Sequence, residues 1–326
     1  MSQQSIAIIG AGMSGLSLAR MLETNFDVTL FEKARGPGGR LASRRHHDMR
    51  FDFGVPFFRI RKKEFSNFLR PYMDQGVLQT WSARFVEIAH DEIIRELEWG
   101  GDPEHWVGAP SMNALAKSIA SGLNIQTQHK IEQINRVKDG WQLMGNDQND
   151  LGTFDWVVST APSQQSALLL PSQFNHLKEI QSIQMVGCYA LMLELDDSFE
   201  HAWDVAHISG SDLSWISINS TKPDRVNKPC VVALSTNLWA EEHMELELDQ
   251  VKSYLVNQLQ LYLDIHEYNH IDCHRWRFAN IQKQQGLQSY VDKKHQLAAC
   301  GDWCIRGFVE NAFLSARDAA SQILQA

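Results

Sequence analysis

The sequence lacks any long hydrophobic run. No stretch approaches the roughly 18 consecutive apolar residues that a membrane helix requires, and the first apolar run, Ile6–Ile9, stops at Gly10. No signal peptide is visible. Cysteine is also scarce: five residues are scattered along the chain, an odd number that does not suit a disulfide framework. We therefore expect reduced thiols in a cytoplasmic protein that does not bind membranes.

The chain also has no linker rich in glycine, serine or proline, no internal repeat and no low-complexity tract. Hydrophobic residues make up 44 % and charged residues 21 % of the chain, which excludes a disordered, collagen-like or coiled-coil protein. At about 150 residues per domain, a length of 326 residues predicts two domains. Because no linker joins them, the chain must cross between these domains more than once.

Positive charge is in deficit over the chain as a whole. The formal net charge is −9, so general attraction to nucleic acid or anionic lipid is not expected. Residues 33–63 are an exception, with ten basic residues against two acidic ones. This basic segment carries +8 and the rest of the chain −17. It is either a solvated charged face or a binding site for an anion, such as a dinucleotide substrate.

The motifs of nucleophilic and metal-dependent catalysis are missing. The sequence has no G-x-S-x-G elbow, no H-E-x-x-H, no C-x-x-C pair and no P-loop. We therefore assign no catalytic residue and predict no metal site. His46 and His47 are interpreted as exposed loop residues. Cys300 and Cys304 are interpreted as packed thiols, with a redox disulfide as the alternative.

Hydrophobic patterning predicts an α/β fold that begins with a βαβ unit. Ser5–Ile9 reads as a strand, a glycine turn and a helix to about Glu23 follow, and Asp27–Phe31 reads as a second strand. Further strands are expected around residues 124, 131, 141 and 154 and over 155–159, 185–195 and 297–300, and further helices over 111–119, 251–263 and 311–324.

The glycine turn carries a dinucleotide-binding fingerprint. Gly10, Gly12 and Gly15 have the G-x-G-x-x-G spacing between the first strand and its helix. The N–H groups at the start of this helix attract a pyrophosphate, and the Ser14 hydroxyl can add a donor. Glu32 ends the second strand, where a carboxylate that accepts hydrogen bonds from a ribose is expected.

Two further segments identify the dinucleotide. Gly39 and Arg40 follow Glu32 closely, and their types suit a loop that passes near a cofactor and forks a guanidinium onto phosphate oxygens. Near the other end, CGDWCIRGFVENAFLSA joins a strand to a helix. Together with the fingerprint, these segments resemble the flavin-containing amine oxidase superfamily. The resemblance implies that Asp302 meets the ribityl and pyrophosphate region of FAD, and that backbone at Val309 meets the flavin ring.

The resemblance is closest to bacterial renalase-like flavoproteins. It is carried by the strings RGPGGRLASRR, HWVGAPSMNALA, NSTKPDR, HRWRFANI and CGDWC. It implies a Rossmann-type FAD-binding domain with an inserted α+β substrate domain, as in p-hydroxybenzoate hydroxylase. Residues 1–60, 105–162 and 285–326 would form the FAD-binding domain, and residues 61–104 and 163–284 the substrate domain.

The same resemblance implies an oxidase with noncovalently bound FAD. Such proteins take a hydride from a reduced nicotinamide, a dihydro isomer of NAD(P), and pass the electrons to dioxygen with formation of peroxide. This transfer needs no general base. The partners expected are thus dioxygen and a small anionic or dinucleotide substrate. The implied cofactor contacts are Gly10, Gly12, Met13, Ser14, Gly15, Glu32, Lys33, Gly39, Arg40, Val55, Pro56, Ile131, Gly301, Asp302 and Val309.

Aromatic residues are the candidates for substrate contact, because a flat ring requires flat walls. Phe58, Trp215 and Trp276 are proposed for this role, with Phe57 and Phe278 as further candidates. Two departures from the family pattern leave alternatives open. Pro56 stands where an amide is common, and Asn311 where a glycine is common. An oxidase of a small amine and a noncatalytic flavin-bound redox or interaction module are therefore kept as alternative functions.

Overall fold

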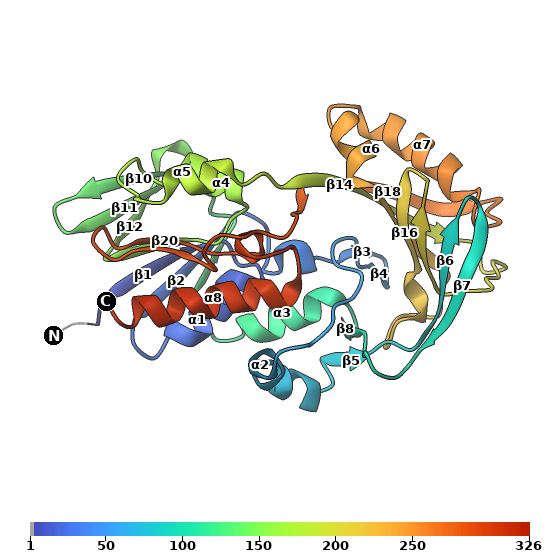
Figure 1. The fold of residues 1–326 in the computed structure, drawn as a ribbon, viewed down its shortest axis with the longest axis horizontal. Helices are drawn as coiled ribbons and strands as arrows, with labels where there is room; N and C mark the ends of the chain where they lie inside the picture. Colours follow the sequence, from blue (N-terminus) through green and yellow to red (C-terminus); the bar gives the residue numbers. More distant parts are fainter. Residues whose placement is uncertain (1–2) are drawn as a thin grey trace. The chain divides into compact units, whose positions relative to one another are not determined.

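The computed structural model describes residues 3–326, which divide into two units (Figure 1). Unit 1 contains residues 3–40, 116–185 and 281–326, and unit 2 contains residues 41–115 and 186–280. The chain crosses between them more than once. Compared with the division expected from the sequence, residues 41–60 and 105–115 lie in unit 2, and residues 163–185 and 281–284 lie in unit 1.

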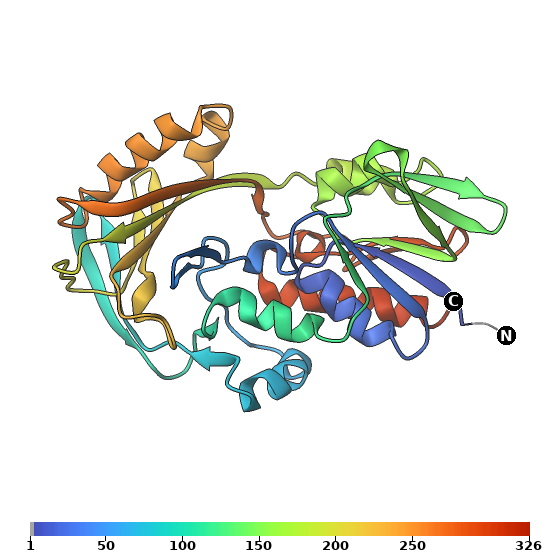
Figure 2. The same cartoon turned by 180° about the vertical axis from the view of Figure 1, so that it is seen from behind.

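A six-stranded sheet forms the centre of unit 1. Its order is β19, β20, β13, β1, β2 and β9, and every neighbouring pair is parallel except β19 with β20. Strands β1 (Ser5–Ile9) and β13 (Trp156–Ser159) are almost entirely apolar because layers of other elements cover both sheet faces. Helices α1 (Met13–Leu22) and α8 (Val309–Ile323) pack together on one face, and α4, α5 and the sheet of β10–β12 lie over the other (Figures 1 and 2).

The remaining elements of unit 1 are mostly short. α3 has its residues divided between the two units. The bounds are β2 (Asp27–Glu32), β9 (Ile125–Thr127), β10 (Ile131–Val137), β11 (Gly140–Gly145), β12 (Asp150–Phe154), β19 (Tyr290–Asp292), β20 (Leu297–Ala299), α3 (Met112–Ala120), α4 (Ser163–Leu169), α5 (Leu177–Ser182), η1 (Gly39–Leu41), η2 (Asn146–Gln148) and η4 (Asp302–Cys304).

Unit 2 is built on a seven-stranded sheet in the order β18, β14, β17, β16, β15, β6 and β7. All neighbours are antiparallel except β15 with β6. The bounds are β3 (Arg44–His46), β4 (Met49–Phe51), β5 (Leu78–Thr80), β6 (Ala83–Ala89), β7 (Glu92–Trp99), β8 (Trp106–Gly108), β14 (Val186–Leu195), β15 (Val205–Ser209), β16 (Leu213–Ile218), β17 (Cys230–Ser235), β18 (Tyr268–Asn280), α2 (Lys63–Asp74), α6 (Asn237–Glu242), α7 (Leu248–Leu259) and η3 (Asn219–Thr221).

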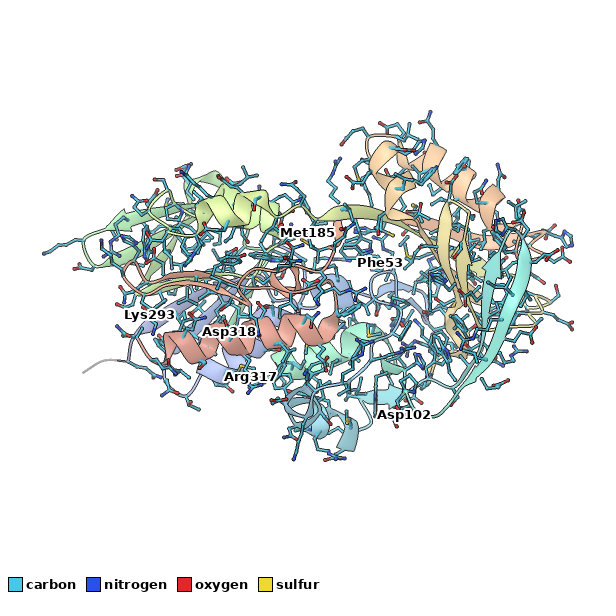
Figure 3. All side chains as sticks on the ribbon, in the orientation of Figure 1. Phe53, Asp102, Met185, Lys293, Arg317 and Asp318 are labelled. Atoms are coloured by element: carbon cyan, nitrogen blue, oxygen red, sulfur yellow. The ribbon has the colours of Figure 1, made fainter. Side chains whose placement is uncertain are left out.

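Strand β14 shows how this sheet is covered on both faces. Leu191 and Leu193 belong to the apolar core that includes residues of α6 and α7, whereas Met192 packs with residues of β4. Alternate side chains of a strand point to opposite faces, so one strand serves both layers. Burial of each such side chain contributes roughly 1.5–3 kcal/mol. Phe53, labelled in Figure 3, extends the β4 side of this core. This packing places residues 41–60 in unit 2.

The expected strands and helices are present close to their predicted positions. His46 is the exception among the residues interpreted above. It lies on strand β3 rather than in an exposed loop, and its ring stacks on His270 with the centroids 3.7 Å apart. A three-residue polar strand shows no hydrophobic alternation, so the sequence does not reveal it. Within residues 3–326, no helix is long and apolar enough to cross a membrane.

Candidate functional site

The glycine fingerprint lies at the end of β1 in unit 1, and its backbone leaves no room for a side chain at Gly10 or Gly15. A Cβ atom at Gly15 would lie 2.0 Å from the Gly10 carbonyl oxygen. Gly10 itself has a φ of +105°, which an L side chain rarely adopts. Thr160 supports the turn, because its hydroxyl lies 3.0 Å from the carbonyl oxygens of both Ile9 and Gly10. Sequence analysis missed Thr160; the only signal is a polar residue directly after the buried strand β13.

The loop that contains Gly38 and Gly39, the second glycine loop, lies directly against the first glycine loop, residues 10–15. The Gly38 N–H donates to the Ala11 carbonyl oxygen at 2.8 Å, and a Cβ atom at Gly12 would lie 3.9 Å from the Gly39 Cα. Gly12 is the N-cap of α1 and provides no side-chain acceptor. The N–H groups at the start of α1 are therefore available to an external anion such as a pyrophosphate.

Glu32 is fixed at the end of β2 by the backbone. Its two carboxylate oxygens accept hydrogen bonds from the N–H groups of Ala11, at 2.9 Å, and Ala34, at 2.8 Å. Only 7 % of the residue is exposed. Each carboxylate oxygen can accept more than one hydrogen bond. The side chain is therefore held in place while retaining acceptor capacity for ribose hydroxyl groups.

The segment that contains Asp302 contacts the segment that contains Gly39 and Arg40 through a pair of side chains. Arg40 donates from Nη1 to Asp302 Oδ2 at 2.8 Å and from Nη2 to Asp302 Oδ1 at 2.5 Å. Gly301 is held by the Ser315 hydroxyl, which accepts its N–H at 2.9 Å. The segments near residues 10, 40 and 302 are thus brought together in unit 1.

Helix α8 begins at Val309, after Phe308, which offers no side-chain cap. Asn311, the departure from the family pattern, turns its amide Nδ2 to the Arg306 carbonyl oxygen at 2.9 Å. The added side chain therefore ties down the loop before α8. Small buried residues of the helix, among them Ala316, allow its packing on α1.

Four further expected cofactor contacts are found in unit 1. Met13 and Ile131 are buried, and Lys33 is exposed with its Nζ 3.3 Å from Gln165 Oε1. The Ser14 hydroxyl lies 3.4 Å from Cys300 Sγ. The thiols of Cys300 and Cys304 are both free and buried, and burial raises the pKa of Cys300 to about 12.

The residues of this cradle fit FAD. Gly10 and Gly15 allow a tight turn at the end of β1, α1 presents N–H groups without a side-chain cap, and Glu32 retains acceptor capacity. These are the donors and acceptors that a dinucleotide pyrophosphate and ribose require. The described residues contain no cluster of histidine, cysteine and acidic side chains that could hold a metal ion.

The other predicted site residues lie in unit 2. Val55 and Pro56 are partly exposed. Phe58 is buried, and its backbone pairs with that of Trp106. Trp276 stacks on Phe53 with centroids 5.2 Å apart and donates its indole N–H to the Phe53 carbonyl oxygen at 2.9 Å.

Trp215 belongs to a group of rings that sequence analysis did not assemble. We call this group the Trp99 cluster; it consists of Phe57, Phe85, Trp99, His105 and Trp215. The imidazole of His105 stacks on Trp99, with centroids 3.6 Å apart and planes 5° apart. Arg59 donates from Nη2 to His105 Nε2 at 2.8 Å. The cluster combines flat apolar faces with a cation at its edge.

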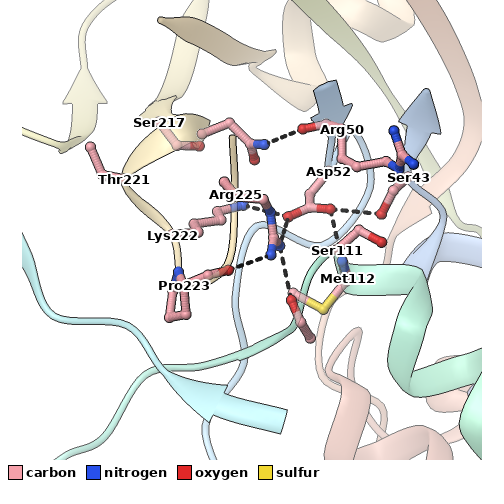
Figure 4. A network of polar contacts seen from close by, with 12 residues as sticks. Ser43, Arg50, Asp52, Ser111, Met112, Ser217, Thr221, Lys222, Pro223 and Arg225 are labelled. Atoms are coloured by element: carbon pink, nitrogen blue, oxygen red, sulfur yellow. Dashed lines mark hydrogen bonds and ion pairs between the residues drawn. The ribbon is translucent and has the colours of Figure 1, made fainter. Parts of the chain in front are cut away.

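A buried polar network in unit 2 was also not foreseen (Figure 4). Asp52 accepts hydrogen bonds from Lys222 at 3.1 Å and Arg225 at 2.6 Å, from the Ser43 hydroxyl at 2.6 Å and from the Met112 N–H at 2.8 Å. Burial raises the pKa of the Asp52 carboxyl, but the two cations and the hydrogen bonds outweigh burial and lower it to about 2. Asp52 is therefore ionised at neutral pH and joins the NSTKPDR segment to the start of α3.

Comparisons with known sequences agree with this geometry. The model of the flavin containing amine oxidoreductase family matches residues 61–324, and that of the NAD(P)-binding Rossmann-like domain matches residues 8–72. A coproporphyrinogen III oxidase of Staphylococcus aureus (strain NCTC 8325 / PS 47) is 42 % identical over 62 residues. That match covers 18 % of this chain and only 13 % of the curated relative.

Solved structures share the fold over the full length. A candidate protoporphyrinogen oxidase from Exiguobacterium sp. 255-15 superposes with a TM-score of 0.81 at 12 % identity, and the match covers 100 % of both chains. A putrescine oxidase bound to putrescine has a TM-score of 0.67 at 12 % identity, also over 100 % of both chains. Since the flavin family model spans well over half of the chain, this protein belongs to the flavin containing amine oxidoreductase family and is an FAD-dependent oxidoreductase.

Proposed function

We propose that the protein is a renalase-like oxidase of a reduced nicotinamide, a dihydro isomer of NAD(P). The reaction would break one C–H bond of the dihydropyridine, whose hydrogen leaves with both electrons as a hydride. The chemistry that bound FAD supplies is acceptance of this hydride and delivery of two electrons to dioxygen, which takes up two protons and leaves as hydrogen peroxide. The oxidised nicotinamide is the other product.

The observation that carries this proposal is the sign of the charge beside the Trp99 cluster. Arg59 contacts the cluster through His105. A cationic amine would be repelled by this guanidinium group, whereas an anionic nucleotide would be attracted. The flat faces of the cluster suit an aromatic or dihydropyridine ring. Nicotinamide nucleotides combine both properties.

We also propose roles for the two units. Unit 1 would be the FAD-binding domain, with noncovalent attachment and with all the cofactor contacts predicted above except Val55 and Pro56, which belong to unit 2. Unit 2 would be the substrate domain, and together they would correspond to the p-hydroxybenzoate hydroxylase type of fold. All five cysteines are free and buried, which suits action in the cytoplasm.

A tetrapyrrole oxidase is the second candidate. Carboxylates of a tetrapyrrole are anionic and would also be attracted by Arg59, and relatives described as porphyrinogen oxidases favour this possibility. Oxidation of a small amine, as the family description suggests, is less favoured, because the charged group that contacts the Trp99 cluster through His105 is the guanidinium of Arg59.

Peroxide formation under air tests the proposal. The purified holoprotein is mixed in parallel with dihydronicotinamide isomers, with porphyrinogens and with a panel of amines that includes putrescine. We expect peroxide to accumulate fastest with one of the dihydronicotinamide isomers. Faster peroxide formation with an amine or a porphyrinogen than with every dihydronicotinamide isomer would overturn the proposal.

A further inference from the structure

Arg59 of unit 2 is held by an imidazole. Four other arginines of this unit, Arg44, Arg84, Arg225 and Arg277, each pair with a carboxylate. Within residues 3–326, Arg59 makes no ion pair with a carboxylate; its Nη2 and Nε donate to His105 Nε2 at 2.8 and 3.2 Å. The residue is partly buried. Its positive charge is therefore held in place without being neutralised.

The hydrogen bonds define the state of His105. Because Arg59 donates to Nε2, this nitrogen carries the lone pair and the ring proton lies on Nδ1. Nδ1 is buried without a hydrogen-bond partner among the described residues. Burial, together with the charge of Arg59, lowers the pKa of His105 to about 4, so the imidazole is neutral at neutral pH. Only 4 % of His105 is exposed, and its stacking on Trp99 fixes the ring.

The neutral imidazole of His105 affects the charge of Arg59 differently from a carboxylate. A carboxylate orients a guanidinium but cancels its charge, whereas the imidazole of His105 orients it and leaves the charge for a ligand. Phe57 and Trp215 are partly exposed members of the same cluster, with their centroids 5.4 Å apart. A fixed cation thus lies beside partly exposed flat rings.

We propose that Arg59 is the residue of unit 2 that binds the anionic group of the substrate, with Phe57 and Trp215 contacting its flat ring. His105 is a positioning residue that orients Arg59 without neutralising it. The ligand class is a planar ring that carries a phosphate or a carboxylate. The assignment of this ligand as a nicotinamide nucleotide, bound through phosphate, rests on the proposed function.

Binding of oxidised ligands tests the proposal without any turnover. Nicotinamide riboside and nicotinamide mononucleotide differ by one phosphate, and their dissociation constants with the holoprotein can be measured by isothermal titration calorimetry. We expect the mononucleotide to bind at least about tenfold more tightly, which corresponds to about 1.4 kcal/mol. Arg59→Gln should abolish this preference, and Arg59→Lys should retain part of it. Arg95→Gln, which changes an exposed cation on β7, should leave it unchanged.

Two substitutions of His105 separate positioning from simple packing. His105→Gln retains a neutral acceptor and should keep most of the preference for phosphate. His105→Glu offers a carboxylate to Arg59 and should abolish the preference while circular dichroism shows a folded protein. Equal preference in both variants would show that the neutral acceptor is irrelevant and would overturn the role of His105.

A second pair of ligands, coproporphyrin and its methyl ester, tests whether Arg59 binds a carboxylate or a phosphate. One outcome is that the protein prefers coproporphyrin to its methyl ester, that Arg59→Gln removes this preference, and that the two nicotinamide ligands bind equally well. Arg59 would then bind a carboxylate of the substrate and not a phosphate. Absence of an Arg59-dependent preference in both pairs would overturn the proposal. If Arg59 governs mononucleotide binding but no dihydronicotinamide isomer yields peroxide, the anion site stands and the proposed function fails.

Discussion

Arg40 and Asp302, 262 positions apart in the sequence, form a bidentate ion pair in unit 1. The carboxylate of Asp302 is almost fully buried, and the guanidinium of Arg40 is partly exposed. The pair ties the second glycine loop to the strand end before α8. Because Gly38 is bonded to Ala11 in the first glycine loop, all three segments are linked through hydrogen bonds of the protein itself. The cofactor cradle is therefore organised by the chain and not only by its ligand.

This linkage predicts that Arg40 and Asp302 act as a unit in holding FAD. Arg40→Gln and Asp302→Asn should each weaken FAD binding by tenfold or more, and the double variant should be little worse than either single one. A coupling free energy of about 0.5–3 kcal/mol is expected for residues in contact. Titration of the deflavinated proteins with FAD measures it. If the losses of FAD-binding free energy in the two single variants add up to the loss in the double variant, the two residues do not act as a unit.

Glu32 should be required for retention of the cofactor. Glu32→Ala removes the acceptors of the Ala11 and Ala34 N–H groups and leaves the buried N–H of Ala11 unpaired, with a cost of about 1–3 kcal/mol. We expect the ratio of flavin to protein after purification to fall markedly. Glu23→Ala is the matched control, because Glu23 follows α1 on the exposed surface and pairs with Arg20. Full flavin occupancy in Glu32→Ala would contradict the ribose role.

The sequence predicted the cradle because its members lie in short linear motifs. Gly10, Gly12 and Gly15 have a fixed spacing, and Glu32 follows at the distance that a βαβ unit dictates. Gly39, Arg40 and Asp302 were identified through a family resemblance, not through spacing. The parallel pairing of β1 with β2 follows from the same βαβ start.

The polar features of unit 2 could not be predicted in this way. Asp52 accepts a hydrogen bond from Lys222, which lies 170 positions away in the sequence, and no periodic pattern predicts that contact. The pairing of Arg59 with His105 is likewise between two loops. Trp276 was singled out for substrate contact, but its stacking on Phe53 gives it a packing role that a lone aromatic residue does not reveal. Such contacts depend on tertiary packing, which composition and spacing do not encode.

Acid should destabilise the protein through His105. Its folded-state pKa of about 4 lies below its ordinary value of 6.5, so the unfolded chain binds the proton first as the pH falls. The contribution to stability is fully present above about pH 6.5 and is lost as the pH falls toward 4. At pH 5 the loss is about 2 kcal/mol.

His105→Gln isolates this effect, since other histidines such as His274, whose pKa burial also lowers to about 4, titrate in both proteins. Urea unfolding at pH 7 and pH 5 measures the free energy of unfolding. The wild type should lose about 2 kcal/mol more than the variant between these pH values. An equal loss in both proteins would show that His105 does not remain neutral in the folded state.

Asp52 should be essential for folding of unit 2. Asp52→Asn leaves the buried cations of Lys222 and Arg225 without a counter-charge, and loss of one partner of a buried ion pair costs about 3–5 kcal/mol. Asp196→Asn is the control, because Asp196 is an exposed residue whose carboxylate accepts hydrogen bonds from nearby Ser198. Thermal unfolding followed by circular dichroism compares the two. A similar midpoint for both variants would show that the network contributes little.

Anaerobic mixing of the holoprotein with dihydronicotinamide isomers tests the central claim most directly. The account predicts that one molar equivalent of an isomer bleaches the visible absorbance of the bound flavin completely. Admission of air should then restore the colour and release one peroxide per flavin. Flavin that stays yellow with every dihydronicotinamide isomer, but is bleached by putrescine or a porphyrinogen, would contradict the account.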